Sequence, residues 1–306
     1  MSTRQFITTK QAKHQVNIFG FPLILYILLN LLLWNGTGII YRFFPDSLLG
    51  IDPEILCMGA GCVLILMITF GCFSISAMRL HLPIRDYLQP TGMDMIHRIA
   101  LVCIGLAITV LTTYTGSFLN FLLHPAGSEF AFIGHFTTRA NIIRNILYLL
   151  LYVLLKPVCD EYIFRGIIQR QLGHYSRFFG VLASSLLYAI AQPSLSDAIP
   201  AFFLGWYLAL VTLRYHSIRP AVTIHVLVSV FLWIVAIIPP EYSLIPIIVI
   251  TLNYIVTLLF IIGNTVNYRI AFMRFPEKKL WKTVFTSSTI IICILLFVAE
   301  NILSFF

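Results

Sequence analysis

The sequence predicts an all-α membrane protein, a polytopic bundle of transmembrane helices. Of its 306 residues, 59% are hydrophobic and only 10% are charged, and the mean hydropathy is +0.92. Soluble globular chains carry about 25% charged residues, so this composition excludes a water-soluble core. Helices of roughly 20 apolar residues satisfy their own backbone hydrogen bonds in lipid, and this chain has several apolar runs of about that length.

Nine apolar runs are candidate spans, with eight as the alternative count. The first run follows a basic stretch, but it is too long for a signal-peptide core and lacks a small-x-small cleavage site, so we expect a retained span. The fifth to seventh runs are short for a hydrocarbon layer of roughly 30 Å, which predicts that longer helices surround them. The nine runs are residues 18–41, 56–78, 99–123, 146–169, 178–191, 198–213, 221–238, 244–262 and 284–305.

The basic residues outside the spans predict how the chain lies in the membrane. With the N-terminus inside, fifteen of them fall on the inner side, and only Arg42, Arg139 and Arg144 fall on the outer side. Basic loops resist translocation, so we expect a cytoplasmic N-terminus and a single multi-pass integral membrane domain over residues 1–306. The net charge of +8 then belongs mainly to cytoplasmic loops, and it predicts contact with membrane lipid and not with nucleic acid.

The fourth run carries charged residues inside apolar sequence. Asp160, Glu161 and Arg165 each cost on the order of 3 kcal/mol at mid-bilayer on insertion scales, so their presence needs an explanation. Glu161 and Arg165 are four residues apart and are expected to pair along one helix face. Asp160 points about 100° away and is expected to lack a partner within its own helix. The alternative is a cytoplasmic helix end, where Arg165 reaches water and Glu161 neutralises it.

Two later runs carry pairs of polar residues spaced by one helical turn. Tyr188 and Gln192 end the fifth run, and His225 and Ser229 lie early in the seventh. Each helix can therefore present a polar ladder to the bundle interior, although a single histidine such as His225 is more often an interhelical hydrogen bonder. We predict that Asp160, Glu161, Gln192 and His225 face one shared, water-accessible pocket.

These residues resemble the CAAX protease and bacteriocin-processing (CPBP) family of intramembrane endopeptidases. The family pattern is Glu-Glu-x-x-x-Arg, then Phe-x-x-x-His, then His-x-x-x-Asn, and the resemblance covers about residues 157–230. It implies a CPBP-like core in spans four to seven, over residues 146–238. The matching motifs are Asp160-Glu161-x-x-x-Arg165, Tyr188-x-x-x-Gln192 and His225-x-x-x-Ser229, with similar flanks at Phe164-Arg165-Gly166 and Ala201-Phe202-Phe203-Leu204-Gly205.

The resemblance also implies roles for the site residues, and three of them depart from the family pattern. Asp160, Gln192 and Ser229 replace a glutamate, a histidine and an asparagine. In the family the first acid and the second-motif histidine are thought to activate water, while the third motif stabilises the oxyanion. Asp160 is therefore the candidate base, and Glu161 with Arg165 is the positioning pair. Gln192 is expected to orient a water by hydrogen bonding, and His225 and Ser229 are the candidate oxyanion donors.

Three functional hypotheses follow. The first is an endopeptidase that hydrolyses a membrane-associated protein or peptide, and the second is a catalytically silent relative acting as a binding or immunity-type membrane protein. The third is a transporter, for which we find no internal repeat or paired broken helices. We expect no cofactor and no metal, because one imidazole and two adjacent acids do not make a zinc site, and the six cysteines lie in or beside apolar runs without a CxxC motif. Nothing in the sequence selects among prenylated CAAX ends, leader peptides and bacteriocins as substrates.

Overall fold

The computed structural model describes residues 9–43, 51–123, 139–238, 242, 244–263 and 278–303, and it confirms the all-helical membrane class. Within these residues, seven helices are long and apolar enough to cross a membrane, or eight if the bent pair α12 and α13 counts as one span. The predicted cytoplasmic end, residues 1–8, lies outside the described residues, so the orientation in the membrane stays a prediction.

The first three spans are built from α-helices, a π-helical segment and a connecting 3-10 turn. The second span is continuous through three of these segments, from Pro53 to Arg79. The elements are α1 (Thr9–Phe43), α2 (Pro53–Leu66), η1 (Met67–Phe73), α3 (Ser74–Arg79), η2 (Ile84–Leu88) and α4 (Met95–Leu123).

The fourth span alternates between α- and π-helical segments, and six further helices follow it among the described residues. Its segments are α5 (Arg139–Tyr148), η3 (Leu149–Leu155), α6 (Lys156–Asp160), η4 (Glu161–Ile168) and α7 (Gln169–Gly173). The later helices are α8 (Arg177–Ile190), α9 (Leu195–Tyr215), α10 (Arg219–Ile237), α11 (Leu244–Ile262), α12 (Lys278–Phe285) and α13 (Ser288–Leu303).

All nine predicted runs are helical, but two differ from the expected spans. Helix α8 has 14 residues and is therefore about 21 Å long, which is short of the hydrocarbon thickness. Most of its side chains are buried, so it lies inside the bundle as the short fifth run predicted. The ninth run is interrupted, because α12 and α13 meet at an angle of 70°.

Side-chain caps fix where the inner helices begin. Ser176 accepts a hydrogen bond from the Phe179 amide at the start of α8, and Ser194 accepts one from the Asp197 amide at the start of α9. Each cap satisfies an amide that has no partner within its helix. Short turns closed by such caps set the inner helices close to one another in space.

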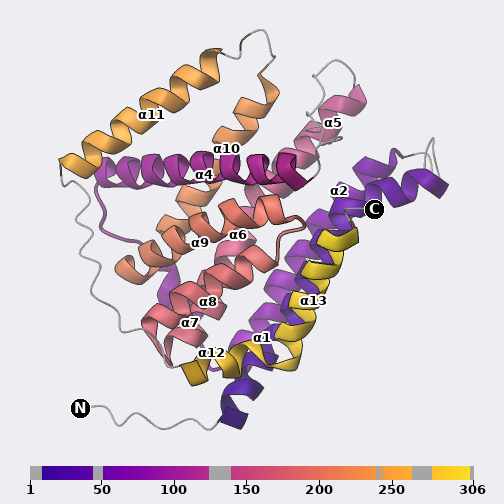
Figure 1. The fold of residues 1–306 in the computed structure, drawn as a ribbon, viewed down its shortest axis with the longest axis vertical. Helices are drawn as coiled ribbons and strands as arrows, with labels where there is room; N and C mark the ends of the chain where they lie inside the picture. The colour runs from indigo at the N-terminus through magenta and orange to yellow at the C-terminus, as the bar shows by residue number, and fades with distance from the viewer. Residues whose placement is uncertain are drawn as a thin grey trace.

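Two hydrophobic cores hold the bundle together, and the fourth span belongs to the first of them. One core joins α1, α2, η4, α8 and α13, and the other joins α4, α9 and α10. In Figure 1, α4 runs across the bundle while α1, α2 and α13 stand side by side at one flank. The apolar side of η4, with Ile163 and Phe164, packs into the first core, so its polar residues face α9 and α10.

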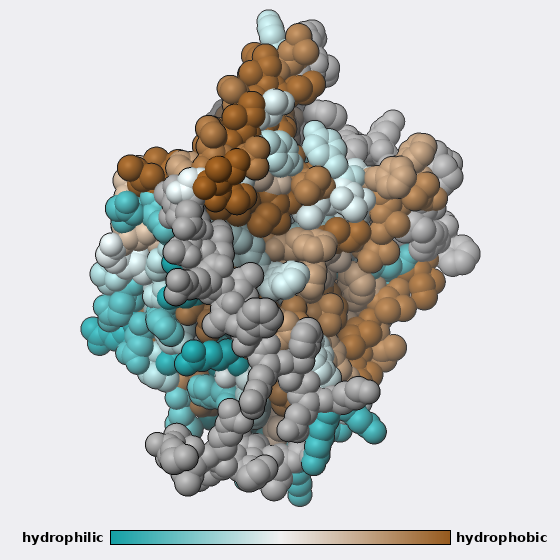
Figure 2. Space-filling view, turned by 60° about the vertical axis from the view of Figure 1, so that its left-hand side comes forward, coloured by the Kyte–Doolittle hydropathy of each residue, from teal (hydrophilic) through white to brown (hydrophobic). Residues whose placement is uncertain are grey.

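The outer helices expose apolar side chains, as a lipid-facing surface requires. Helix α11 shows this most clearly, since Ile247, Leu252 and Leu259 are each more than half exposed. Figure 2 shows hydrophobic residues over the upper and right-hand parts of one face and hydrophilic residues gathered toward its lower left. Exposing this much apolar surface to water is energetically unfavourable, whereas contact of the same surface with lipid is not.

Candidate active site

The predicted acidic motif lies where the fourth span changes from α-helix to π-helix. Pro157 stands at the start of α6 and has no amide hydrogen to donate, so the regular pattern of hydrogen bonds is interrupted there. The next segment, η4, begins at Glu161 and contains Arg165. π-Helical turns are rare and occur frequently at functional sites, because they re-aim side chains that a regular α-helix would place elsewhere.

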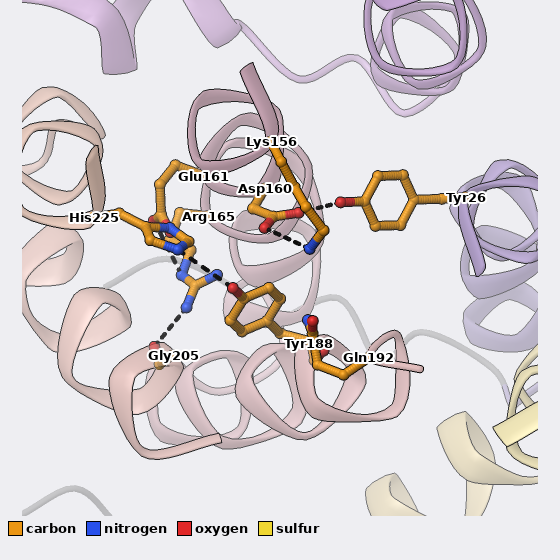
Figure 3. A network of polar contacts seen from close by, with 9 residues as sticks. All are labelled: Tyr26, Lys156, Asp160, Glu161, Arg165, Tyr188, Gln192, Gly205 and His225. Carbon is orange, nitrogen blue, oxygen red and sulfur yellow. Dashed lines mark hydrogen bonds and ion pairs between the residues drawn. The ribbon is translucent and has the colours of Figure 1, made fainter. Parts of the chain in front are cut away.

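Glu161 lies at the centre of one polar cluster (Figure 3), which we call the Glu161 cluster. Its Oε2 lies 3.2 Å from Arg165 Nε, which confirms the expected pair, and its Oε1 lies 2.9 Å from Nδ1 of His225 on α10. Nε2 of the same imidazole is 3.4 Å from the hydroxyl of Tyr188 on α8. Three helical segments thus contribute to one group of residues: η4, α8 and α10.

Arg165 is fully buried, which excludes the alternative that it reaches water at a helix end. Its Nη2 donates to the carbonyl of Gly205 at 2.8 Å, and its guanidinium carbon lies 4.9 Å from the ring centroid of Tyr188. A Cβ at position 205 would come within 2.9 Å of Nη2, so the absence of a side chain lets Arg165 reach the backbone of α9. Gly205 therefore helps to position the arginine that holds Glu161.

Asp160 has different partners, Tyr26 and Lys156, and we call these three residues the Asp160 cluster. Asp160 accepts a hydrogen bond from the hydroxyl of Tyr26 on α1, and its Oδ2 lies 3.3 Å from Lys156 Nζ, one turn earlier in the same span. The expectation that Asp160 has no partner in its own helix is therefore wrong. The spacing of Lys156 and Asp160, four residues, was the signal that could have revealed this pair.

Gln192 and Ser229 do not join either group of residues. Gln192 follows the end of α8. Its side-chain Nε2 donates to the backbone carbonyl of Tyr188, four residues earlier, at 3.1 Å. Ser229 lies one turn beyond His225 and is only partly buried. Among the described residues, no hydrogen bond joins Gln192 or Ser229 to Asp160 or Glu161.

The structure differs from the expectation that these residues face one shared, water-accessible pocket. Asp160 is 1% exposed, Glu161 is fully buried and His225 is 6% exposed, so close packing covers the two acids. They also have different partners, Tyr26 of α1 for Asp160 and His225 of α10 for Glu161 (Figure 3), while Tyr188 of α8 interacts with both acids. A rotation of about 100° between neighbouring helix positions accounts for the different partners.

Three residues of these clusters were not predicted as site residues. Tyr26 and Lys156 hold Asp160, and Tyr188 contacts both Arg165 and His225. Tyr188 occupies the aromatic position of the second motif, which was a usable signal. Tyr26 had none, because a tyrosine in an apolar run is common and only the packing of α1 brings it to Asp160.

The charges of the two clusters balance locally. Lys156 neutralises Asp160, and Arg165 neutralises Glu161, so each buried acid has a cation within 3.3 Å. Such pairing offsets much of the cost of placing charge in a medium of low dielectric constant. In the part of the chain that the structure describes, no three histidine, cysteine or acidic side chains converge as metal ligands. The expected absence of a metal stays a prediction.

Comparison with protein families decides how this constellation is interpreted. Residues 142–231 match the family model described as type II CAAX prenyl endopeptidase Rce1-like, and this stretch runs from α5 into α10. This match supports the assignment of residues 142–231 to the CPBP family. The match contains all three motifs and both clusters except Tyr26. Comparisons with curated proteins and with solved structures find no match.

Proposed function

We propose that this CPBP protein is an intramembrane endopeptidase in which Glu161 and His225 together activate water. The contact of 2.9 Å between Glu161 Oε1 and His225 Nδ1 carries the proposal. It joins two of the three motif residues that match the family pattern unchanged, across two helices, in a buried setting. A carboxylate that orients a histidine is a recurring arrangement for general base catalysis.

The contact determines which nitrogen of His225 is available as a base. An ionised carboxylate only accepts hydrogen bonds, so Nδ1 carries the proton that faces Glu161. In the neutral imidazole Nε2 then holds the free lone pair, and it faces Tyr188. Arg165, whose Nε lies 3.2 Å from the other oxygen of Glu161, holds that carboxylate in position.

The proposed reaction uses Nε2 first as a base and then as an acid. Nε2 removes a proton from water, and the water oxygen attacks the carbonyl carbon of the scissile peptide bond. The imidazolium then gives its proton to the amine nitrogen as the carbon–nitrogen bond breaks, which leaves a carboxylic acid and a free amine. The Tyr188 hydroxyl is the nearest donor for the oxyanion that forms between these steps.

Water and substrate must approach His225 from the side of Tyr188. A separation of 3.4 Å between the hydroxyl and Nε2 is longer than a normal hydrogen bond, yet it leaves no room for a water between the two atoms. The Tyr188 side chain therefore has to move when substrate binds. The substrate we propose is a peptide segment at the membrane, entering between α8 and α10.

A specific observation favours the second candidate, a catalytically silent relative. Asp160, which the family pattern implies as the base, is already engaged by Lys156 and Tyr26, and the glutamine that replaces the family histidine bonds to its own helix end. In such a relative these contacts would serve stability alone. Its function would be to bind a partner in the membrane without hydrolysing it.

Peptide hydrolysis by the purified protein separates the two candidates. The wild-type protein and the variants His225→Gln, Glu161→Gln and Asp160→Asn are incubated in detergent micelles with a peptide library that includes prenylated carboxyl ends. His97→Gln serves as the matched control, because His97 lies on α4, outside both clusters. We expect His225→Gln and Glu161→Gln to lower the cleavage rate by at least about 100-fold, since general base catalysis contributes roughly 10²–10⁴.

Asp160→Asn distinguishes the proposed base from the one that the family pattern implies. We expect this variant to keep most of the activity of the protein that remains folded. A loss as large as that of Glu161→Gln, at an unchanged melting temperature, would make Asp160 the base instead of His225. Absence of cleavage by the wild-type protein over the whole library would favour the silent relative.

A further inference from the structure

Arg165 also lines a cavity that is separate from its contact with Glu161. This cavity of about 240 Å³ opens between η4 with α7, the end of α9 and the turn η2. This volume far exceeds the roughly 10–15 Å³ that one water needs. Residues that line the cavity include Tyr87, Arg165, Gln169, Arg170, Thr212 and His216.

Three buried side chains of this cavity present polar atoms without a hydrogen-bond partner among the described residues. They are Nη1 of Arg165, Oε1 of Gln169 and Oγ1 of Thr212, on side chains that are each at most 6% exposed. Threonines in helices commonly donate to the carbonyl four residues earlier, as Thr109 and Thr223 do here. The Thr212 hydroxyl has no such partner among the described residues, and Thr212 belongs to the cavity lining.

The lining of this cavity is strongly basic. Besides Arg165 it contains Arg170, Arg177, His174 and His216, and no described residue of the lining is an acid. Arg170 stacks on the ring of Tyr87 at 4.1 Å and donates to a backbone carbonyl, so it is held in place without its charge being neutralised. Partial burial and the charge of Arg170 lower the pKa of the His174 imidazole, as expected for a region of positive potential.

The cavity is located at one end of the bundle. Tyr87 precedes α4, His174 follows α7, Arg177 begins α8, and His216 ends α9 with a left-handed backbone conformation. These are the connections that the charge asymmetry predicts to be cytoplasmic. Headgroups of anionic lipids lie at this depth, next to the ends of spanning helices.

We propose that this cavity binds a phosphate-bearing anion, supplied by the headgroup of an anionic phospholipid. Arginine presents forked donors that match phosphate oxygens, and three arginines reach this cavity. The buried Thr212 hydroxyl and Arg165 Nη1 supply donors at its inner end, while Arg170 and Arg177 supply charge nearer the surface. The Gln169 carbonyl accepts from a headgroup hydroxyl or from a water that accompanies the anion.

Binding is measured on the full-length protein with two probes. Inorganic phosphate is titrated calorimetrically in neutral detergent, and lipid retention is counted by native mass spectrometry from micelles containing phosphatidylglycerol or phosphatidylcholine. We expect one phosphatidylglycerol to be retained in preference to phosphatidylcholine. Thr212→Val removes a hydroxyl at nearly constant shape and should weaken the binding about tenfold, the effect of losing a hydrogen bond to a charged group.

Matched controls separate the cavity from general effects of charge and stability. Thr257→Val removes another buried threonine hydroxyl that has no partner among the described residues, but on α11, outside the cavity lining. Arg79→Gln serves in the same way for Arg177→Gln, since both arginines are exposed and only Arg177 lines the cavity. We expect both control variants to retain lipid as the wild-type protein does.

The outcomes identify the source of the anion or overturn the proposal. Saturable binding of inorganic phosphate that Thr212→Val weakens, without lipid retention, supports the phosphate site and assigns it to a free phosphate. Preferential retention of phosphatidylglycerol that depends on Thr212 and Arg177 supports the lipid. Lack of binding by both probes, or binding that Thr212→Val and Arg177→Gln leave unchanged, overturns the proposal and leaves a cavity filled by water. None of these readouts depends on peptide cleavage.

Discussion

Asp160 and Glu161 are adjacent in sequence, yet they belong to two regions of the molecule that differ in construction. Asp160 is held by a lysine of its own helix and by Tyr26 from the N-terminal helix. Glu161 is held by Arg165 and by His225 from α10, and the second imidazole nitrogen faces a hydroxyl at 3.4 Å. Asp160 therefore contacts only a lysine and a tyrosine hydroxyl in its cluster. Glu161 contacts His225, whose second ring nitrogen is able to accept a proton.

This difference teaches that two acids adjacent in sequence need not act as a pair. The contacts of Asp160 join α1 to the fourth span, which is a structural task. The contacts of Glu161 orient a titratable group between three helices, which is the arrangement that chemistry requires. The predictions below test this division, beginning with the largest expected effect.

Removing the cation should lower the free energy of unfolding more in the Glu161 cluster than beside Asp160. Arg165→Met leaves a fully buried carboxylate without its ion pair and also loses the bond to Gly205, so we expect a loss of about 3–5 kcal/mol in the free energy of unfolding. Lys156→Met should cost only about 1–3 kcal/mol, because Lys156 is partly exposed and Tyr26 still donates to Asp160. Unfolding in mixed micelles measures both losses.

A double variant tests whether the unpaired charge causes the larger loss. Glu161→Gln removes that charge, so its addition to Arg165→Met should recover part of the lost free energy. Equal losses for the two single variants, or no recovery in the double variant, would mean that the two acids are held in equivalent ways.

Tyr26 should contribute more than Tyr188 to the free energy of unfolding. Tyr26→Phe removes a hydrogen bond to a buried carboxylate, and we expect it to cost about 1–2 kcal/mol, near the upper end of values measured between membrane helices. Tyr188→Phe removes a long contact with His225 and an interaction with Asp160, which Tyr26 and Lys156 still hold, so it should cost less, about 0.5–1 kcal/mol. It should also lower the rate of peptide cleavage through loss of the oxyanion donor. Thermal unfolding and a cleavage assay of both variants check this, and a larger stability loss for Tyr188→Phe would contradict it.

Much of this organisation was predictable from the sequence, because lipid imposes simple rules on apolar runs. The nine runs are all helices, and the pairing of Glu161 with Arg165 followed from their spacing. The burial of α8 followed from its length, since a short apolar helix satisfies neither water nor the full hydrocarbon layer. Local periodicity was sufficient for these features.

The rest depended on contacts that local periodicity does not encode. Tyr26 reaches Asp160 across 134 positions of sequence, and only the packing of α1 on the fourth span brings them together. The π-helical segment at Glu161 changes the direction of its side chains in a way that no run of hydrophobic residues reveals. The basic cavity was equally hidden, because its arginines and its buried threonine come from four separate segments.

The smallest effect is expected at Gln192, where the family pattern has a histidine. From the pattern alone, Gln192→His should restore a proton acceptor and raise activity. In the structure this side chain follows the end of α8 and bonds to the Tyr188 carbonyl, and Asp160 already has two partners. We therefore expect the cleavage rate of Gln192→His to stay within about twofold of the wild type, well below the 10²-fold that a new general base would add. A gain of that size in a kinetic assay would show that position 192 does reach the reacting water, and that the region around Asp160 opens during catalysis.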